Sequence, residues 1–138
     1  MNNKYSIFET ELTIRPDDID MNNHVHNSKY LDYVLAARYD QMKKDYKVTM
    51  EEFLDRGFTW VVSNATINYK RALVLTDKIV VRTQVEDFNR SQSIVNFEIV
   101  KKENGKVAAD GQFTYTMINV KNGRPSKIPE DFIAKYTI

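Results

Sequence analysis

The sequence contains no cysteine, and the residues that most often interrupt regular structure are rare: four glycines and three prolines among 138 residues. Without cysteine, a disulfide scaffold, a zinc–thiolate site and a thiol nucleophile are all excluded. No internal repeat, low-complexity segment or linker divides the chain. Because 138 residues is an ordinary length for one domain with one core, we expect a single domain over residues 1–138.

The chain also lacks an excess of charge of one sign and any long apolar run. Its 20 basic and 19 acidic residues leave a formal net charge of +1, whereas a nucleic-acid-binding domain is usually clearly basic. No apolar stretch approaches the roughly 18 residues of a membrane span, and the first twelve residues lack the apolar core of a signal peptide. We therefore expect a cytoplasmic protein that binds neither nucleic acid nor membranes.

What remains is a pattern of regular secondary structure. Apolar and polar residues alternate over 5–15, which predicts a half-buried strand. Helix-forming residues at helical spacing over 28–44 predict a long helix with a wide apolar arc, and a shorter helix is predicted over 49–55. Segments rich in Val, Ile, Thr, Phe and Tyr then predict four strands, over 58–70, 78–88, 92–103 and 106–120.

The connections support antiparallel pairing of these strands. The Asn104-Gly105 pair between the last two predicted strands is a strong hairpin signal, and the tail over 129–136 predicts one helical turn. One long apolar helix followed by a run of antiparallel strands indicates an α+β fold, with a sheet wrapped around a buried helix.

Between the first strand and the long helix lies an unusually polar segment, residues 18–30, which holds both histidines of the chain. Asp20, Asn22 and His24 are spaced by two, so in an extended segment their side chains would converge on one side. The helix that follows begins with amides that have no intrahelical partner and carry the positive end of its dipole. Such amides suit a developing oxyanion.

This set of groups has the parts needed to attack an acyl carbonyl. Asp20 could act as general base or nucleophile, while His24 and Asn22 orient water or substrate. Aspartate and asparagine are also common in loops without any catalytic role. On that reading the segment is a solvated loop: Asp17 and Asp18 are turn residues, Asn27 caps the helix and His26 is a partly exposed histidine.

The same segment carries a family resemblance. It follows the pattern D-x-D-x-x-x-H-V-x-N-x-x-Y, with an Ala-Arg pair in the helix behind it, and resembles hotdog-fold thioesterases of the 4-hydroxybenzoyl-CoA thioesterase type. It is similar too to the D-x-N-x-H segment of plant acyl-ACP thioesterases, and INYKRALVLTDKI at 67–79 resembles the strand that follows the short helix in these proteins. The matching residues are Asp18, Asp20, His24, Val25, Asn27, Tyr30, Ala37 and Arg38.

The resemblance implies a hotdog fold: a long central helix wrapped by a five- to six-stranded antiparallel sheet. It also implies a homodimer or homotetramer joined through edge strands, with active sites at the subunit interface. Asp20 falls at the catalytic carboxylate, and helix amides near Asn27, together with Tyr30, would position and polarise the thioester. The substrate would be an acyl-CoA or an acyl carrier protein thioester, and no metal or bound cofactor is needed.

Two departures limit what can be carried over. Many relatives have glycine before the histidine, where this chain has Asn23. The plant enzymes carry Glu-Cys where this chain reads Ala72-Leu73, so a mechanism that needs those two residues is not available here.

Other residues are candidates for holding the rest of the substrate. Lys70, Arg71 and Arg90 lie at or near predicted strand ends, where they could meet phosphates or remain solvated surface charges. Phe58, Trp60 and Val62 alternate along one face of a predicted strand, and either line an acyl tunnel or belong to the core.

Two other functions fit the same fold. The first is hydration or dehydration of an enoyl thioester, which uses a histidine and a carboxylate as an acid–base pair. The Gly- and Pro-rich sequence that usually surrounds the histidine in those enzymes is missing here. The second is a non-catalytic module that binds acyl-CoA without turnover.

Overall fold

Five antiparallel strands form one sheet in the order β1-β3-β4-β5-β2. The computed structural model describes residues 5–45 and 48–136. The predicted strands and helices are confirmed within a few residues at their ends. The strands are β1 (Ile7–Thr13), β2 (Phe58–Tyr69), β3 (Lys78–Asn89), β4 (Gln92–Lys101) and β5 (Val107–Asn119); the helices are α1 (Lys29–Lys44), α2 (Met50–Asp55) and α3 (Glu130–Tyr136).

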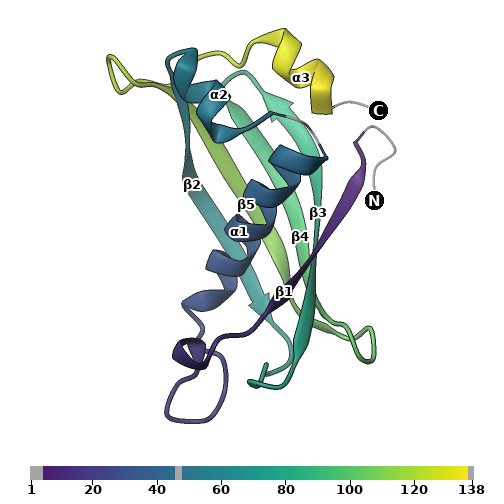
Figure 1. Cartoon of the computed structure of the whole chain (residues 1–138). Helices are drawn as coiled ribbons and strands as arrows, with labels where there is room; N and C mark the ends of the chain where they lie inside the picture. Colours follow the sequence, from purple (N-terminus) through teal and green to yellow (C-terminus); the bar gives the residue numbers. More distant parts are fainter. Residues whose placement is uncertain (1–4, 46–47, 137–138) are drawn as a thin grey trace.

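The order of the strands follows from their connections. Short turns join β3 to β4 and β4 to β5, so these three strands lie side by side. The predicted Asn-Gly turn is present, with Gly105 at φ +72°, a conformation that glycine adopts without steric cost. The two strands that flank α1 in sequence occupy the two opposite edges, because α1 crosses the sheet between them (Figure 1).

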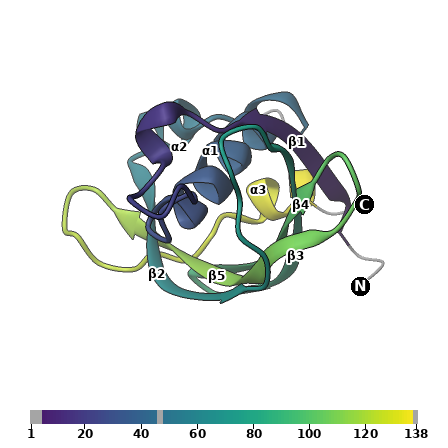
Figure 2. The ribbon, with the colours of Figure 1, turned by 90° about the horizontal axis from the view of Figure 1, so that it is seen from below.

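The sheet curves around α1, as the view from below shows (Figure 2). Residues at helical spacing face the sheet, so one face of the helix is buried. The buried residues of this face are Tyr30, Tyr33, Val34, Ala37, Arg38, Gln41 and Met42.

Two of these buried residues are polar, which the apolar periodicity does not predict. Arg38 Nη1 donates to Thr83 Oγ1 at 3.2 Å, and the Thr83 hydroxyl is hydrogen-bonded in turn to Gln41. Gln41 Nε2 donates to Thr10 Oγ1 at 3.1 Å. These bonds tie α1 to β1 and β3, and they offset part of the cost of removing polar groups from water.

Strand β2 forms one edge of the sheet over twelve residues. It pairs with β5 along its whole length, with a bulge at Ser63, and its other edge has no strand partner among the described residues. Val61 and Tyr69 on this strand are 44% and 48% exposed. A long edge strand with exposed apolar residues is a template for pairing with another chain.

The polar segment singled out in the sequence lies at the end of the sheet where α1 begins. There the β1–α1 loop meets the β2–β3 connection, and Val25 N donates to Leu73 O at 2.8 Å.

No helix in the described part of the chain is long and apolar enough to cross a membrane.

Candidate active site

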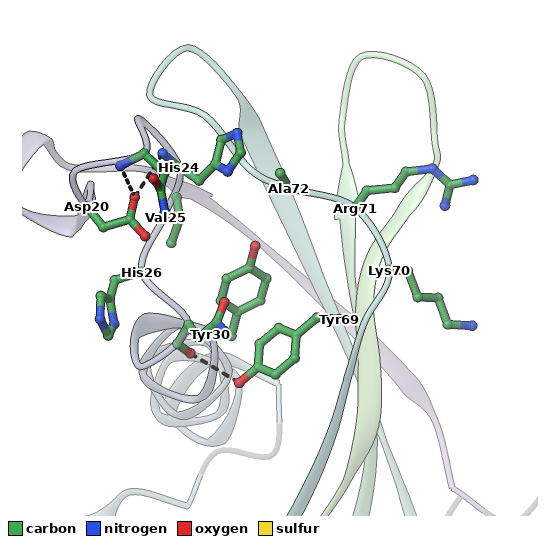
Figure 3. Close-up of a pocket in the computed structure, with 11 residues that line it drawn as sticks. Asp20, His24, Val25, His26, Tyr30, Tyr69, Lys70, Arg71 and Ala72 are labelled. Atoms are coloured by element: carbon green, nitrogen blue, oxygen red, sulfur yellow. Dashed lines mark hydrogen bonds between the residues drawn. The ribbon is translucent and has the colours of Figure 1, made fainter.

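An open pocket with a volume of about 410 Å³ lies where these two loops meet the start of α1 (Figure 3). Its wall is formed by the β1–α1 loop, the first turn of α1 and the end of β2. The lining residues are Asp20, Asn22 and 24–27 from the loop, Tyr30 from α1, and 69–72 from β2 and the segment after it.

The loop that carries Asp20, Asn22 and His24 is a tight turn and not an extended segment. Asp20 N donates to His24 O at 2.8 Å, and Ile19 and Val25 form an isolated antiparallel bridge across the turn. The expectation that these side chains converge because the backbone is extended is therefore wrong. All three still line one pocket, because the turn folds the chain back on itself.

Asn23, at the position where many relatives have glycine, has φ +61°. This left-handed conformation favours glycine, and asparagine is among the few other residues that adopt it readily. The departure from the family pattern therefore preserves the turn.

The Asp20 carboxylate is held through one of its two oxygens. Oδ1 accepts hydrogen bonds from the backbone amides of Asn22 at 2.9 Å and His24 at 3.3 Å (Figure 3). Oδ2 has no hydrogen-bond partner among the described residues. Asp20 thus presents a carboxylate oxygen of fixed position to the pocket, which a nucleophile or general base requires.

Asp18, two residues earlier, has a different environment. The expectation that it is a solvated turn residue is wrong, since it is only 6% exposed. Its Oδ2 accepts from the Tyr33 hydroxyl at 2.7 Å and from Arg15 N at 3.0 Å. Burial alone would raise the pKa of Asp18, but these hydrogen bonds and the positive charges of Lys29 and Arg15 together outweigh it and hold the pKa below its usual range. Asp18 is a structural anchor for the loop.

The predicted Asn27 side-chain cap of α1 is absent, and a histidine side chain bonds the residue just before the helix. Ser28, at the N-cap position, makes no side-chain cap bond. His26 Nδ1 instead accepts from Ser28 N at 3.1 Å and lies 2.8 Å from Ser28 Oγ. The sequence predicts only a partly exposed histidine at position 26. The serine two residues later, at the start of the helix, is the feature that could have indicated this contact.

Asn27 is exposed, and its backbone N–H differs from those of its neighbours in its hydrogen bonding. All the remaining backbone N–H groups from Asn22 to Tyr30 donate a hydrogen bond. The Asn27 N–H has no acceptor within the described part of the chain. This amide at the helix start is therefore available to a ligand in the pocket.

Two tyrosines form the floor of the pocket. Tyr30, buried in the first turn of α1, meets Tyr69 edge to face, with ring centroids 5.0 Å apart and an interplanar angle of 83°. Tyr69 extends its hydroxyl to Asn27 O, to which it donates at 3.2 Å (Figure 3). Burial raises the pKa of Tyr30, so it stays neutral at physiological pH. Tyr69 was not predicted as a site residue.

The two basic residues predicted at the end of β2 both line the pocket but differ in their partners. Lys70 Nζ lies 2.9 Å from Asp110 Oδ2, and this contact holds the pKa of Asp110 below its usual range. Arg71 Nη1 donates to Val107 O at 2.8 Å. Among the described residues no carboxylate pairs with Arg71, so its charge remains available for an anion.

Comparison with known proteins places the chain among enzymes. The family model described as the thioesterase-like superfamily matches residues 14–136. The chain belongs to this family.

Individual relatives agree with this assignment. The chain is 28% identical to the long-chain acyl-CoA thioesterase FadM of Escherichia coli (strain K12) over 113 residues, which are 82% of this chain and 84% of that protein. Among solved structures, the DHNA-CoA thioesterase from Staphylococcus aureus matches with a TM-score of 0.87 at 22% identity, over 94% of this chain and 88% of that one. The probable thioesterase YbaW from Escherichia coli matches with a TM-score of 0.80 at 26% identity, over 92% and 94%. The expected α+β hotdog fold is confirmed.

Within this thioesterase-like fold, three predicted substrate-binding residues lie away from the pocket. Phe58 and Trp60 stand at the opposite end of β2 from Tyr69, and at about 3.3 Å per residue this long strand separates its ends by roughly 35 Å. Trp60 packs on Phe53 and Tyr115 instead, at centroid distances of 5.4 and 5.8 Å. Arg90 lies in the β3–β4 turn, where its carbonyl accepts from Ile128 N. The sequence could not show this, because spacing along the chain does not give distance across a sheet.

Proposed function

We propose that the protein is an acyl-CoA thioesterase that hydrolyses its substrate to a free acid and a thiol. One observation carries this proposal: Asp20 has a carboxylate oxygen without a hydrogen-bond partner, in the same pocket as the Asn27 amide without an acceptor. A carboxylate and an amide donor are the two groups that thioester hydrolysis needs. The similarity to FadM, whose name is that of a long-chain acyl-CoA thioesterase, supports the acyl-CoA substrate.

In the general-base form of the reaction, Asp20 takes a proton from water and the hydroxyl attacks the thioester carbonyl carbon. The negative charge that develops on the carbonyl oxygen is stabilised by the Asn27 N–H at the positive end of α1. The tetrahedral intermediate collapses with cleavage of the carbon–sulfur bond. The leaving thiolate then recovers the proton from Asp20, and the balance needs no metal or cofactor.

In the nucleophilic form, Asp20 Oδ2 attacks the carbonyl carbon itself and expels the thiolate. The mixed anhydride that results is hydrolysed by water in a second step. In both forms His24 and Asn22 position the reacting groups, since both side chains line the pocket and are exposed.

Arg71 supports coenzyme A as the carrier of the acyl group. Arg71 is one of the residues that line the pocket, and its guanidinium has no carboxylate partner among the described residues. Coenzyme A carries phosphates that such a group binds in a fork geometry. Lys70 would contribute less, because Asp110 already neutralises its charge. An acyl carrier protein thioester is the alternative carrier.

We further propose that two copies pair through β2. The unpaired edge of this strand and its exposed Val61 and Tyr69 support such pairing. Because Tyr69 also lines the pocket, the partner copy would lie next to the active site. Sedimentation velocity should show a dimer or a tetramer, and a monomer at micromolar concentration would refute the pairing.

The function is tested by thiol release from short, medium, long and aromatic acyl-CoAs, with wild type and Asp20→Asn measured together. Release that is lost in the variant supports a thioesterase that depends on Asp20. Asp17→Asn is the matched control, since Asp17 is an exposed aspartate of the neighbouring turn paired with Arg15 at 3.0 Å, outside the pocket. No release from any acyl-CoA or acyl carrier protein ester would refute the proposal.

A further inference from the structure

The peptide group that joins Asn27 to Ser28 is held at both of its polar ends. Its oxygen, Asn27 O, accepts from the Tyr69 hydroxyl at 3.2 Å. Its N–H, on Ser28, donates to His26 Nδ1 at 3.1 Å. One contact comes from the end of β2, 42 positions away in sequence, and the other from the loop itself. A peptide plane fixed at its oxygen and at its nitrogen cannot rotate without breaking one of these bonds.

This peptide group is next to the amide that the proposed reaction uses. The Asn27 N–H and the Asn27 carbonyl share one Cα, so they are related by only two soft torsions. Rotation of the 27–28 peptide would therefore redirect the 26–27 peptide, which carries the Asn27 N–H. Oxyanion stabilisation depends on donors that already point to where the charge develops, with tolerances of a fraction of an ångström.

Tyr69 is well placed to hold such a position. It is the last residue of β2 and pairs with Ala109 of β5 in the sheet ladder. Its ring rests against buried Tyr30. The phenol hydroxyl is thus set by the sheet on one side and by α1 on the other, although the residue is 48% exposed.

We propose that Tyr69 and His26 are positioning residues, which hold the Asn27–Ser28 peptide so that the Asn27 N–H is directed at the thioester carbonyl oxygen. This inference rests on the proposed thioesterase function and adds two residues that the reaction itself does not require. Neither residue exchanges a proton or forms a bond with the substrate.

The first test removes one hydroxyl. In Tyr69→Phe we expect kcat to fall by about tenfold with KM unchanged, less than the 10²- to 10³-fold that loss of an oxyanion donor costs. Tyr39→Phe is the matched control: Tyr39 is 46% exposed on α1, and its hydroxyl donates to Glu51 at 2.6 Å outside the pocket. Equal kcat in Tyr69→Phe and wild type would overturn the inference.

The second test restores an acceptor at His26. An Asn side chain can accept from the backbone N–H two residues on, which is the geometry of an Asx-turn. We expect His26→Ala to lower kcat about as much as Tyr69→Phe, and His26→Asn to recover part of the loss. The double variant Tyr69→Phe/His26→Ala should lose less than the product of the two single losses, because both act on one peptide. No rescue by Asn would overturn the role of His26.

The third test does not depend on turnover. With an acyl-CoA bound to Asp20→Asn, polarisation by the Asn27 amide lowers the stretching frequency of the thioester carbonyl, as seen by isotope-edited infrared spectroscopy. We expect Tyr69→Phe in this background to reduce that shift while acyl-CoA still binds. An unchanged shift, or no shift in Asp20→Asn itself, would overturn the inference. A wild-type protein that binds acyl-CoA and shows the shift but releases no thiol would instead refute the proposed function alone.

Discussion

The two ends of the sheet are built in opposite ways. At the end where α1 begins, Asp20 Oδ2 and the Asn27 N–H lie in residues that line an open pocket, and neither group has a hydrogen-bond partner among the described residues. At the other end, aromatic rings close the core: the centroid of the Phe53 ring lies 5.4 Å from that of Trp60 and 4.2 Å from that of Phe132.

Charge is treated differently at the two ends as well. At the aromatic end, Arg56 is paired with Asp131 at 2.7 Å, and its guanidinium also lies 4.2 Å from the centre of the Phe132 ring. At the pocket end, the buried carboxylate of Asp18 accepts hydrogen bonds from the Tyr33 hydroxyl and Arg15 N. The nearby Asp20 has one carboxylate oxygen without a hydrogen-bond partner among the described residues. Groups with satisfied partners therefore stabilise the fold, and the groups that keep an unpaired polar atom are the ones that can react.

The substitution Asp20→Asn changes the pocket end alone. Asp20→Asn should lower kcat by about 10³-fold, within the range for loss of a general base, and change the melting temperature by no more than about 2 °C, because an Asn Oδ1 can accept the same two backbone hydrogen bonds. Steady-state thiol release and thermal denaturation measure both quantities. A variant that retains most of its activity would show that the role assigned to Asp20 is wrong.

The converse substitution breaks the aromatic end. Phe53 is fully buried, so Phe53→Ala should lower the free energy of unfolding by about 3–5 kcal/mol through lost burial and the cavity left behind. Urea denaturation measures this loss. At a temperature where the variant remains folded, its KM should equal that of wild type; a tenfold change in KM would show that the two ends are not independent.

A smaller effect sharpens what the pocket end recognises. Arg71→Ala should raise KM for an acyl-CoA about tenfold, since a charge-assisted hydrogen bond is worth roughly 1.5–3 kcal/mol. KM for the same acyl group on N-acetylcysteamine, which has no phosphates, should not change. Lys121→Ala is the control, because Lys121 is an exposed lysine in the loop after β5 that does not line the pocket. Equal effects on both substrates would mean that Arg71 does not bind phosphate.

The smallest effect concerns the paired carboxylate. Hydrogen bonds hold the pKa of Asp18 below its unfolded value of about 3.9. Its contribution to stability is therefore complete above that pH and is lost as the pH falls through the lower, folded pKa. Urea titrations from pH 5 to pH 2 should show a steeper loss for wild type than for Asp18→Asn. Equal slopes would mean that Asp18 is not coupled to folding.

The sequence predicted most of the fold because local patterns carried it. Alternation marked β1, helical spacing marked α1, and β-rich segments separated by turn residues marked β2 to β5, each close to its observed bounds. Buried Arg38 and Gln41 were missed, because a periodicity of apolar residues gives no signal for polar side chains that are satisfied across the core.

The candidate site was predicted in part. Asp20, Asn22, His24, Asn27, Tyr30, Lys70 and Arg71 do line one pocket. Phe58, Trp60 and Arg90 do not, and Tyr69 and His26 were overlooked. What could not be predicted was which residues of distant segments meet, since that depends on strand register and on the path of α1.

The order of the elements and the motif that marks the family can be read from the amino-acid sequence, because hydrophobic periodicity and residue spacing are properties of the chain. The burial of Asp18, next to an Asp20 that lines the pocket, becomes visible in the folded molecule alone. The same is true of the hydrogen bond from the Tyr69 hydroxyl to Asn27 O, 42 positions away in sequence. Contacts of this kind arise from the packing of β2 against the start of α1, and no local pattern encodes them.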